Sequence, residues 1–241
     1  IYGNRAANGV VIITTKRGKE GAMQISLDAI TSFQTEPEKY DLLNAEQFAT
    51  LAQERAEEDG FALVPAWNDP SSLRNIDWQD EIYRSGLRQS YNVSIRGGGE
   101  KLQSAFSLGL VDQKGIVLGS DYKRYNASLN ADYQATKWLK ASVSLKYTRS
   151  NSKIALGTGG QDAGVGVGTL TKLIPTMTGN PDTDQVKDAQ GNYGYFTKDN
   201  TAVNYLDNPI ALIETQDQKN INNFLLASGY LEATIVEGLK V

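Results

Sequence analysis

The strongest constraint on the fold is a regular alternation of apolar and polar side chains over long stretches of the chain. Successive side chains of a β-strand point to opposite faces, so a period of two indicates a strand with one apolar face. The intervening positions hold Ser, Asn, Gln, Asp and Lys, which makes the second face polar rather than a second core. Six strands are predicted, about ten residues or longer against a usual length of about five or six. Their alternating parts are residues 23–34, 90–96, 103–110, 125–133, 139–148 and 220–236.

The connections between these strands alternate between short and long. Tight turns are expected at residues 97–101 and 135–137, a loop at 112–123, and the two longest connections at 35–87 and 151–218. Transmembrane β-barrels combine apolar-out, polar-in strands with short turns at one end and long loops at the other. The sequence therefore predicts an all-β fold, a transmembrane antiparallel β-barrel with small helices in its extracellular loops.

Aromatic side chains on the apolar faces gather at the two ends of the predicted strands, as the two aromatic girdles of a membrane barrel require. A soluble β-sandwich also alternates, so a secreted β-sandwich module that binds carbohydrate stays open as the alternative. A barrel segment should need detergent and partners, whereas the module should be a soluble monomer. The girdle residues are Phe33, Tyr91, Tyr125 and Tyr147 at the long-loop end, with Tyr133 and Trp138 at the other end.

The composition excludes several classes of function. Lys and Arg number 24 and Asp and Glu 28, a net charge of −4, which gives no basic footprint for nucleic acid. The chain has no His and no Cys, so thiolate catalysis and zinc–thiolate sites are excluded. The longest aliphatic run, residues 10–13, is far shorter than the roughly 20 residues that a spanning helix needs.

Paired carboxylates are the remaining catalytic option, and they are poorly arranged for it. Glu54, Glu57, Glu58 and Asp59 cluster on one predicted helix, whereas a glycosidase needs two carboxyl groups opposed across a cleft. We therefore expect no enzyme activity.

Two further motifs resemble ligand sites, and neither is complete. Residues 157–168 are glycine-rich but lack the Gly-Lys-Ser/Thr ending of a phosphate-binding loop. Asp182, Asp184 and Asp188 are spaced like calcium ligands, but the intervening residues do not fit such a loop. Neither a cofactor nor a metal ion is expected.

The long loops carry the predicted helices and the candidate contact residues. Asn44 and Gln47 have the spacing of a capping box for a helix that runs to about residue 58, and Asp77 caps a shorter helix. Loop aromatics could stack on sugars, pack on peptides or contact a partner protein, although ordinary loop packing is the alternative, and Trp78 could simply anchor its helix. The candidates are Trp67, Trp78, Tyr193, Tyr195 and Phe196.

Residues 9–16 differ from the six alternating segments because they are β-branched and apolar on both faces. Such a pattern indicates a strand buried on both sides. With the flanking residues it forms the sequence Ile-Tyr-Gly-Asn-Arg-Ala-Ala-Asn-Gly-Val-Val-Ile-Ile-Thr-Thr-Lys-Arg-Gly at residues 1–18. This segment resembles the end of the plug domain in TonB-dependent outer-membrane transporters of the SusC/RagA family. Residues 75–82, 91–99 and 123–126 are similar to the same family in order and spacing.

The resemblance implies how the chain is divided and what it does. Residues 1–21 would be the end of the plug, and residues 22–241 the N-terminal part of a barrel of about 22 strands. Six strands cannot close a barrel, so further strands are expected beyond them. The implied function is import of oligosaccharides or peptides across the bacterial outer membrane with a SusD-like surface lipoprotein. Energy would come from TonB, which the family engages through a segment absent from this chain.

Overall fold

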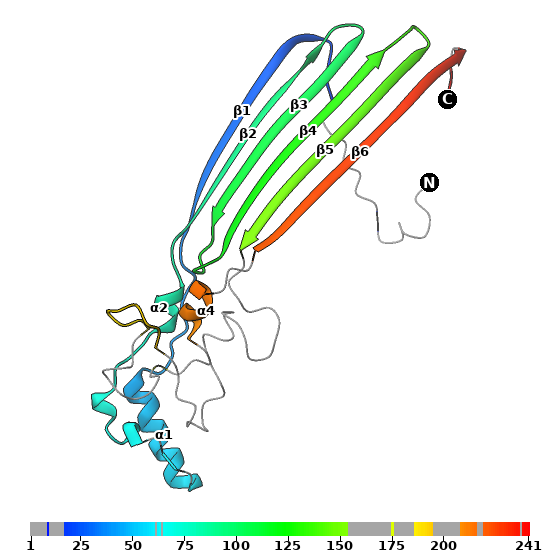
Figure 1. Ribbon diagram of the computed structural model, residues 1–241. Helices are drawn as coiled ribbons and strands as arrows, with labels where there is room; N and C mark the ends of the chain where they lie inside the picture. Colours follow the sequence, from blue (N-terminus) through cyan, green and yellow to red (C-terminus); the bar gives the residue numbers. More distant parts are fainter. Residues whose placement is uncertain are drawn as a thin grey trace.

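A single antiparallel sheet dominates the computed structural model, with its strands in chain order (Figure 1). The structure describes residues 9, 17–60, 62–63, 65–153, 175, 186–194, 208–215, 219–236 and 238–241. Within these residues the six long strands that the alternation predicts are confirmed, and a two-residue strand pairs with the last of them. The strands are β1 (Gly21–Gln34), β2 (Gly86–Gly98), β3 (Leu102–Lys114), β4 (Asp121–Gln134), β5 (Leu139–Lys153), β6 (Lys219–Val236) and β7 (Leu239–Lys240).

The register of the sheet keeps the apolar and polar positions in phase from strand to strand. Leu27, Val93 and Leu108 are direct neighbours on β1, β2 and β3, and the row continues through Ala127, Tyr147 and Leu225. The adjacent row holds Ser26, Ser94, Ser107, Ser128 and Lys146. The sheet therefore has one continuous apolar face and one polar face. Ile30, Phe224 and Leu226 are apolar side chains on the polar face.

No second sheet covers the apolar face in the part of the chain that the structure describes. Large side chains on that face stay exposed, for example Leu27 at 70%, Leu108 at 49% and Leu225 at 69%. A β-sandwich buries this face against a second sheet, so the sandwich alternative finds no support here.

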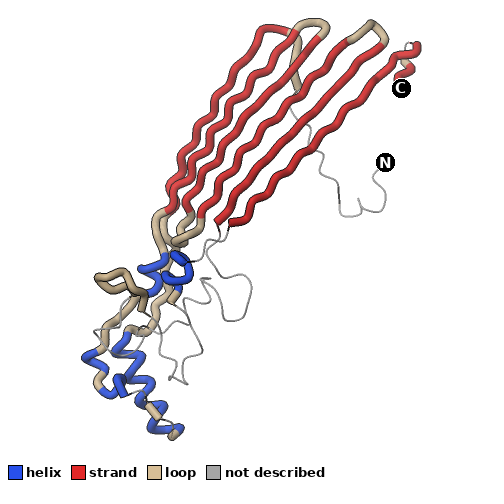
Figure 2. Tube along the Cα trace, viewed as in Figure 1, coloured by secondary structure: helices blue, strands red, loops and turns tan. Residues whose placement is uncertain are grey.

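The two ends of the sheet differ in their connections (Figure 2). Three or four residues join β2 to β3 and β4 to β5, whereas β1–β2 and β5–β6 are joined by the long connections at the opposite end. The β3–β4 loop covers only residues 115–120, and the predicted limits of 112–123 were wrong. Its strands continue as far as the Lys114–Asp121 pair, since Asp112 and Lys123 face each other and form an ion pair of 2.7 Å.

The described parts of the long connections and of the β3–β4 loop pack together at one end, and we call them the loop layer. Asn44 caps α1 (Ala45–Asp59) through the predicted capping box, and Gly60 ends the helix with a φ of 73°. Asp77 caps α2 (Trp78–Ile82) by accepting hydrogen bonds from the amides of Gln79 and Asp80. Three elements were not predicted: η2 (Pro65–Asn68), η3 (Pro70–Ser72) and α4 (Pro209–Thr215).

The buried apolar residues lie almost entirely in the loop layer. One cluster centres on Ile82 and Trp78 of α2 and includes Ile210 and Ile213 of α4. A second, smaller cluster joins Ala49 of α1 to Trp67. Val111 is the single buried apolar side chain of the described strands. No helix among the described residues has the length and apolar character to cross a membrane.

The predicted buried strand at residues 9–16 falls outside the described residues apart from Gly9. Its place in a plug, and the division of the chain at residue 21, stay predictions.

Candidate functional site

A cavity of about 610 Å³ opens in the loop layer between α2, α4 and a turn at residues 186–194. Lys187 and Tyr193 form an antiparallel bridge that closes this turn. The cavity combines acidic, basic and apolar side chains, so it can receive a polar solute or a polar protein surface. Its lining residues are Arg74, Asn75, Ile76, Asp77, Asp80, Glu81, Leu118, Val186, Lys187, Ile210 and Glu214.

Asn208 fixes one wall of the cavity. The side chain is 3% exposed and donates through Nδ2 to the carbonyls of Val186 and Gly194, at 2.9 and 2.8 Å. Its Oδ1 accepts from the amide of Ile210 at 3.0 Å, which caps α4. One buried amide therefore joins the start of α4 to both sides of the 186–194 turn. The role of Asn208 was not predicted, although Asn followed by Pro is a helix-start signal.

Gln79 joins two segments of the loop layer in a similar way. This side chain is 3% exposed, accepts from the amide of Tyr40 and donates to the carbonyl of Tyr40, both at 2.9 Å. The reciprocal pair holds the segment before α1 against α2. Sequence gives no signal for it, because the two residues lie 39 positions apart.

Two charged groups of the cavity lining, Glu214 and Asp80, form ion pairs. Glu214 accepts hydrogen bonds from Lys187 Nζ and the Tyr193 hydroxyl, each at 2.7 Å. The Lys187 hydrogen bond, followed by that of Tyr193, lowers the pKa of Glu214, and Glu214 raises the pKa of both partners. Lys39 pairs in the same way with Asp80, which lowers the pKa of that carboxyl group and raises that of Lys39.

Of the five predicted contact aromatics, the structure describes three. Trp67 and Trp78 are each 3% exposed: Trp67 meets the ring of Phe48 edge-on at 5.2 Å between centroids, and Trp78 belongs to the α2–α4 cluster. Tyr193 packs at the edge of that cluster with its hydroxyl on Glu214. Tyr195 and Phe196 fall outside the described residues.

The acidic residues noted in the sequence are occupied locally or face solvent. Glu54, Glu57, Glu58 and Asp59 are exposed on α1, where Asp59 pairs with Arg55 at 3.2 Å. Asp188 accepts from the side chain and the amide of Asn192 and from the amide of Gln190, and these hydrogen bonds lower its pKa. Asp182 and Asp184 lie outside the described residues. Where the structure is described, no three His, Cys, Asp or Glu side chains converge as metal ligands.

The polar face of the sheet carries a second hollow, of about 600 Å³. Hydroxyl and amide side chains dominate it, with three cationic groups (Arg96, Arg124 and Lys146) and one carboxylate (Asp28). Ser107 and Ser128 share a hydrogen bond of 2.7 Å across β3 and β4. A wall of this chemistry suits water or a polar occupant.

No family model matches the chain, but individual proteins match almost all of it. It is 31% identical to the TonB-dependent receptor SusC of Bacteroides thetaiotaomicron over 93% of the chain and 22% of that protein. It is 30% identical to the TonB-dependent receptor P3 of Formosa agariphila over its whole length and 22% of that protein. The whole chain superposes on 29% of the matched chain in the solved structure of the RagAB peptide transporter, with a TM-score of 0.74 and 20% sequence identity.

The chain belongs to the SusC/RagA family of TonB-dependent receptors. It spans about a fifth of the length of these relatives. The RagAB importer in its closed-closed state gives the same likeness of fold, with a TM-score of 0.72 at 19% identity. The predicted fold, a segment of an antiparallel β-barrel with small loop helices, is confirmed. The matched relatives are named as receptors and importers, which supports a role without enzyme activity.

Proposed function

We propose that the protein takes part in TonB-dependent import of oligosaccharides or peptides across the bacterial outer membrane. The observation that carries the proposal is the similarity to SusC over 93% of the chain, together with a sheet whose apolar face lies exposed. The sheet serves as part of the barrel wall, with its apolar face toward lipid and its polar face toward the lumen. Residues 1–21 end the plug and residues 22–241 begin the wall.

The loop layer forms the extracellular end in this proposal. Membrane barrels keep their short turns on the periplasmic side, so the two long connections face the outside. Their predicted limits of 35–87 and 151–218 narrow to residues 35–85 and 154–218, because β2 begins at Gly86 and β5 ends at Lys153. A SusD-like lipoprotein binds at this end, and energy comes from TonB. Solved relatives named RagAB peptide importers support the idea of a peptide-importing complex.

The candidate contact residues belong to this extracellular end. Trp67 and Trp78 are buried, so they support the surface of the loop layer by packing below it and do not contact a partner directly. Tyr193 packs at the edge of the α2–α4 cluster, and its hydroxyl donates to Glu214, which lines the cavity. Tyr195 and Phe196 follow it in sequence and stay candidate contact residues in this proposal.

Whole-cell labelling of the full-length receptor tests the orientation. Two single-cysteine variants are compared, Gln190→Cys and Glu100→Cys. Position 190 lies on the exposed 186–194 turn, and position 100 lies on the exposed β2–β3 turn at the opposite end. A membrane-impermeant maleimide should label position 190 in intact cells and position 100 only after permeabilisation. The reverse pattern would overturn the orientation and the loop assignment with it.

Uptake by cells tests the import itself. Cells that lack the receptor should lose uptake of one class of labelled oligosaccharide or peptide, and cells that lack TonB should lose it equally. Uptake that persists without TonB would contradict the proposal.

A further inference from the structure

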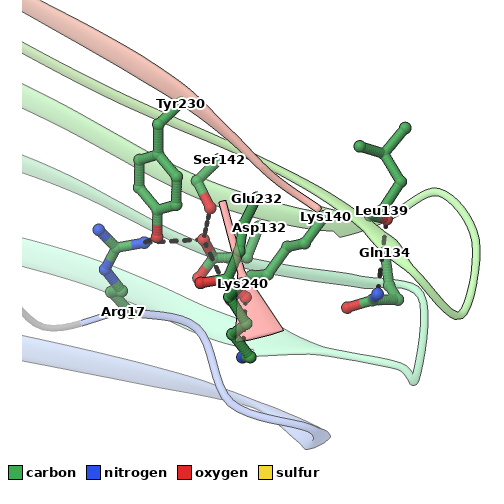
Figure 3. A network of polar contacts seen from close by, with 9 residues as sticks. All are labelled: Arg17, Asp132, Gln134, Leu139, Lys140, Ser142, Tyr230, Glu232 and Lys240. Atoms are coloured by element: carbon green, nitrogen blue, oxygen red, sulfur yellow. Dashed lines mark hydrogen bonds and ion pairs between the residues drawn. The ribbon is translucent and has the colours of Figure 1, made fainter. Parts of the chain in front are cut away.

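A polar network on the polar face, at the short-turn end, joins Arg17 to three strands (Figure 3). Arg17 Nη1 donates to Asp132 Oδ1 on β4 at 2.7 Å and to the Tyr230 hydroxyl on β6 at 3.3 Å. The guanidinium group also lies 5.7 Å from the centre of the Tyr230 ring. Asp132 accepts a further hydrogen bond from Ser142 on β5.

Asp132 is a buried carboxylate, and it depends on Arg17 for its charge partner. The residue is 8% exposed, and among the described residues the second cation that pairs with it, Lys140, is 3.8 Å away. A buried charge that loses its close partner is strongly unfavourable, because neither water nor another group replaces the lost interaction. Separation of Arg17 from the sheet would leave Asp132 with the Ser142 hydroxyl and the more distant ammonium group.

Gly18 brings the backbone of the same segment directly onto β3. A Cβ atom at this position would lie 2.3 Å from the amide nitrogen of Ser104 and 2.7 Å from the carbonyl carbon of Gln103. No side chain fits there without displacing backbone. Residues 17 and 18 together therefore contact the polar face from β3 to β6.

We propose that Arg17 and Gly18 form a fixed anchor, which stays bound to the polar face of the sheet while the receptor imports its substrate. That the receptor imports a substrate rests on the proposed function. The anchor itself rests on the contacts of Arg17 and Gly18 with the sheet. Arg17 is a positioning residue, because it holds the chain that enters β1 rather than a solute. Any movement of the chain upstream of residue 17 then takes place with this contact in place.

Reversible cross-linking of the full-length receptor tests the anchor. This chain has no Cys, so Arg17→Cys with Asp132→Cys gives a defined pair once any cysteines elsewhere in the receptor are replaced. A short bis-methanethiosulfonate reagent bridges the two thiols, and a reductant releases them. The anchor predicts no loss of uptake on bridging. A loss of uptake that the reductant restores would overturn it, because the segment would then have to leave the sheet.

Two control pairs separate the anchor from other effects. Ser107→Cys with Ser128→Cys bridges neighbouring positions of one wall and reports any harm from the reagent itself. Lys19 follows Gly18, whose backbone lies against Ser104, so Lys19→Cys with Ser104→Cys gives a second pair that keeps Arg17 and Asp132 intact. It applies the same test if the first pair reduces the amount of folded receptor.

A second measurement decides the anchor without relying on uptake. The cross-linking yield of Lys19→Cys with Ser104→Cys is compared in cells with and without TonB, each supplied with the substrate mixture. A fixed anchor predicts equal yields, and a lower yield with TonB would overturn it. If the uncross-linked receptor imports nothing, the proposed function is wrong. The cross-linking yields with and without TonB still show whether residues 17 and 18 stay bound to the sheet.

Discussion

The sheet and the loop layer of this protein use apolar side chains in opposite ways. In the sheet they are exposed: Phe33 is 83% exposed and Leu231 is 70% exposed. The loop layer has apolar clusters that are buried, in which Ile82 is fully buried and Trp78 is 3% exposed, although Tyr40 and Leu43 near α1 stay exposed. The loop layer packs like a small water-soluble domain, whereas the sheet has almost no core of its own.

The difference indicates that the two regions are adapted to different solvents. Burial of apolar area away from water stabilises the loop layer in the ordinary way. The sheet gains its order from backbone hydrogen bonds between neighbouring strands, which is what a lipid environment demands of every backbone polar group. Substitutions should therefore have consequences that depend on the region, and the following experiments use the full-length receptor.

The largest effect is expected from Trp78→Ala in the loop layer. Removal of a buried indole should destabilise the α2–α4 cluster by about 3–5 kcal/mol, from lost burial and the cavity left behind. Limited proteolysis should cut the loop layer at lower temperature while the sheet stays protected. Trp138→Ala is the matched control, because Trp138 is 55% exposed at the short-turn end. Equal proteolysis of the two variants would contradict the division into two regions.

The next largest effect is expected within the sheet, from Leu108→Arg on the apolar face. An arginine on the lipid face near the middle of the membrane should cost about 2–4 kcal/mol. Ser107→Arg lies one residue away on the polar face and should be milder, although it loses the Ser107–Ser128 hydrogen bond. Urea titration of the receptor folded in lipid vesicles measures both. Equal losses would mean that the two faces share one environment.

The same contrast explains how much of the structure could be predicted from the sequence. Alternation and capping are local properties, so the strands, the capping box of α1 and the Asp77 cap of α2 were all predicted. α4 was missed because its seven residues, with apolar side chains from Ile210 through Ile213, are too short a pattern to show a helical period. The length of the β3–β4 loop was overestimated, because the charged residues at the strand ends have the composition of a loop.

The candidate site was harder to predict than the fold. A loop tryptophan has the same sequence signal whether it faces solvent or fills a core, so the burial of Trp67 and Trp78 came only from the structure. Contacts such as Gln79 with Tyr40, or Arg17 with Asp132 across 115 positions, depend on tertiary packing that no local pattern encodes.

A smaller effect is expected from the start of α1. Asn44 accepts from the amide of Gln47 at 2.8 Å, and the Gln47 side chain accepts from the amide of Asn44 at 3.0 Å. Asn44→Ala removes the side-chain acceptor of the first bond and keeps the backbone amide of the second, and loss of this cap should destabilise the helix by about 1 kcal/mol. Hydrogen exchange of residues 45–59, followed by mass spectrometry, should speed up while the strands are unchanged. Glu54→Gln, an exposed substitution on the same helix, is the control, and an equal change there would exclude a capping effect.

The smallest effect is expected from the pH dependence of the Lys187–Glu214 pair. The hydrogen bonds of Lys187 and Tyr193 lower the pKa of Glu214 below its ordinary value of 4.5, so the pair stabilises the folded loop layer above that value. This stability is lost as the pH falls through the lowered pKa of the folded state. At the alkaline side, the pKa of Lys187 is raised above 10.5, so the contribution of the pair is lost only as the pH rises through that raised value.

Glu214→Gln measures this contribution, which should be small because both side chains of the pair are 41% exposed. The variant should open its loop layer at a lower temperature than the parent at neutral pH. The difference between them should shrink below pH 4.5, as the carboxyl group of the parent becomes protonated. Thermal unfolding of the two purified receptors across this range gives the comparison, with Glu57→Gln on the exposed face of α1 as the control. A difference that persists unchanged in acid would show that the Glu214 charge does not stabilise the loop layer.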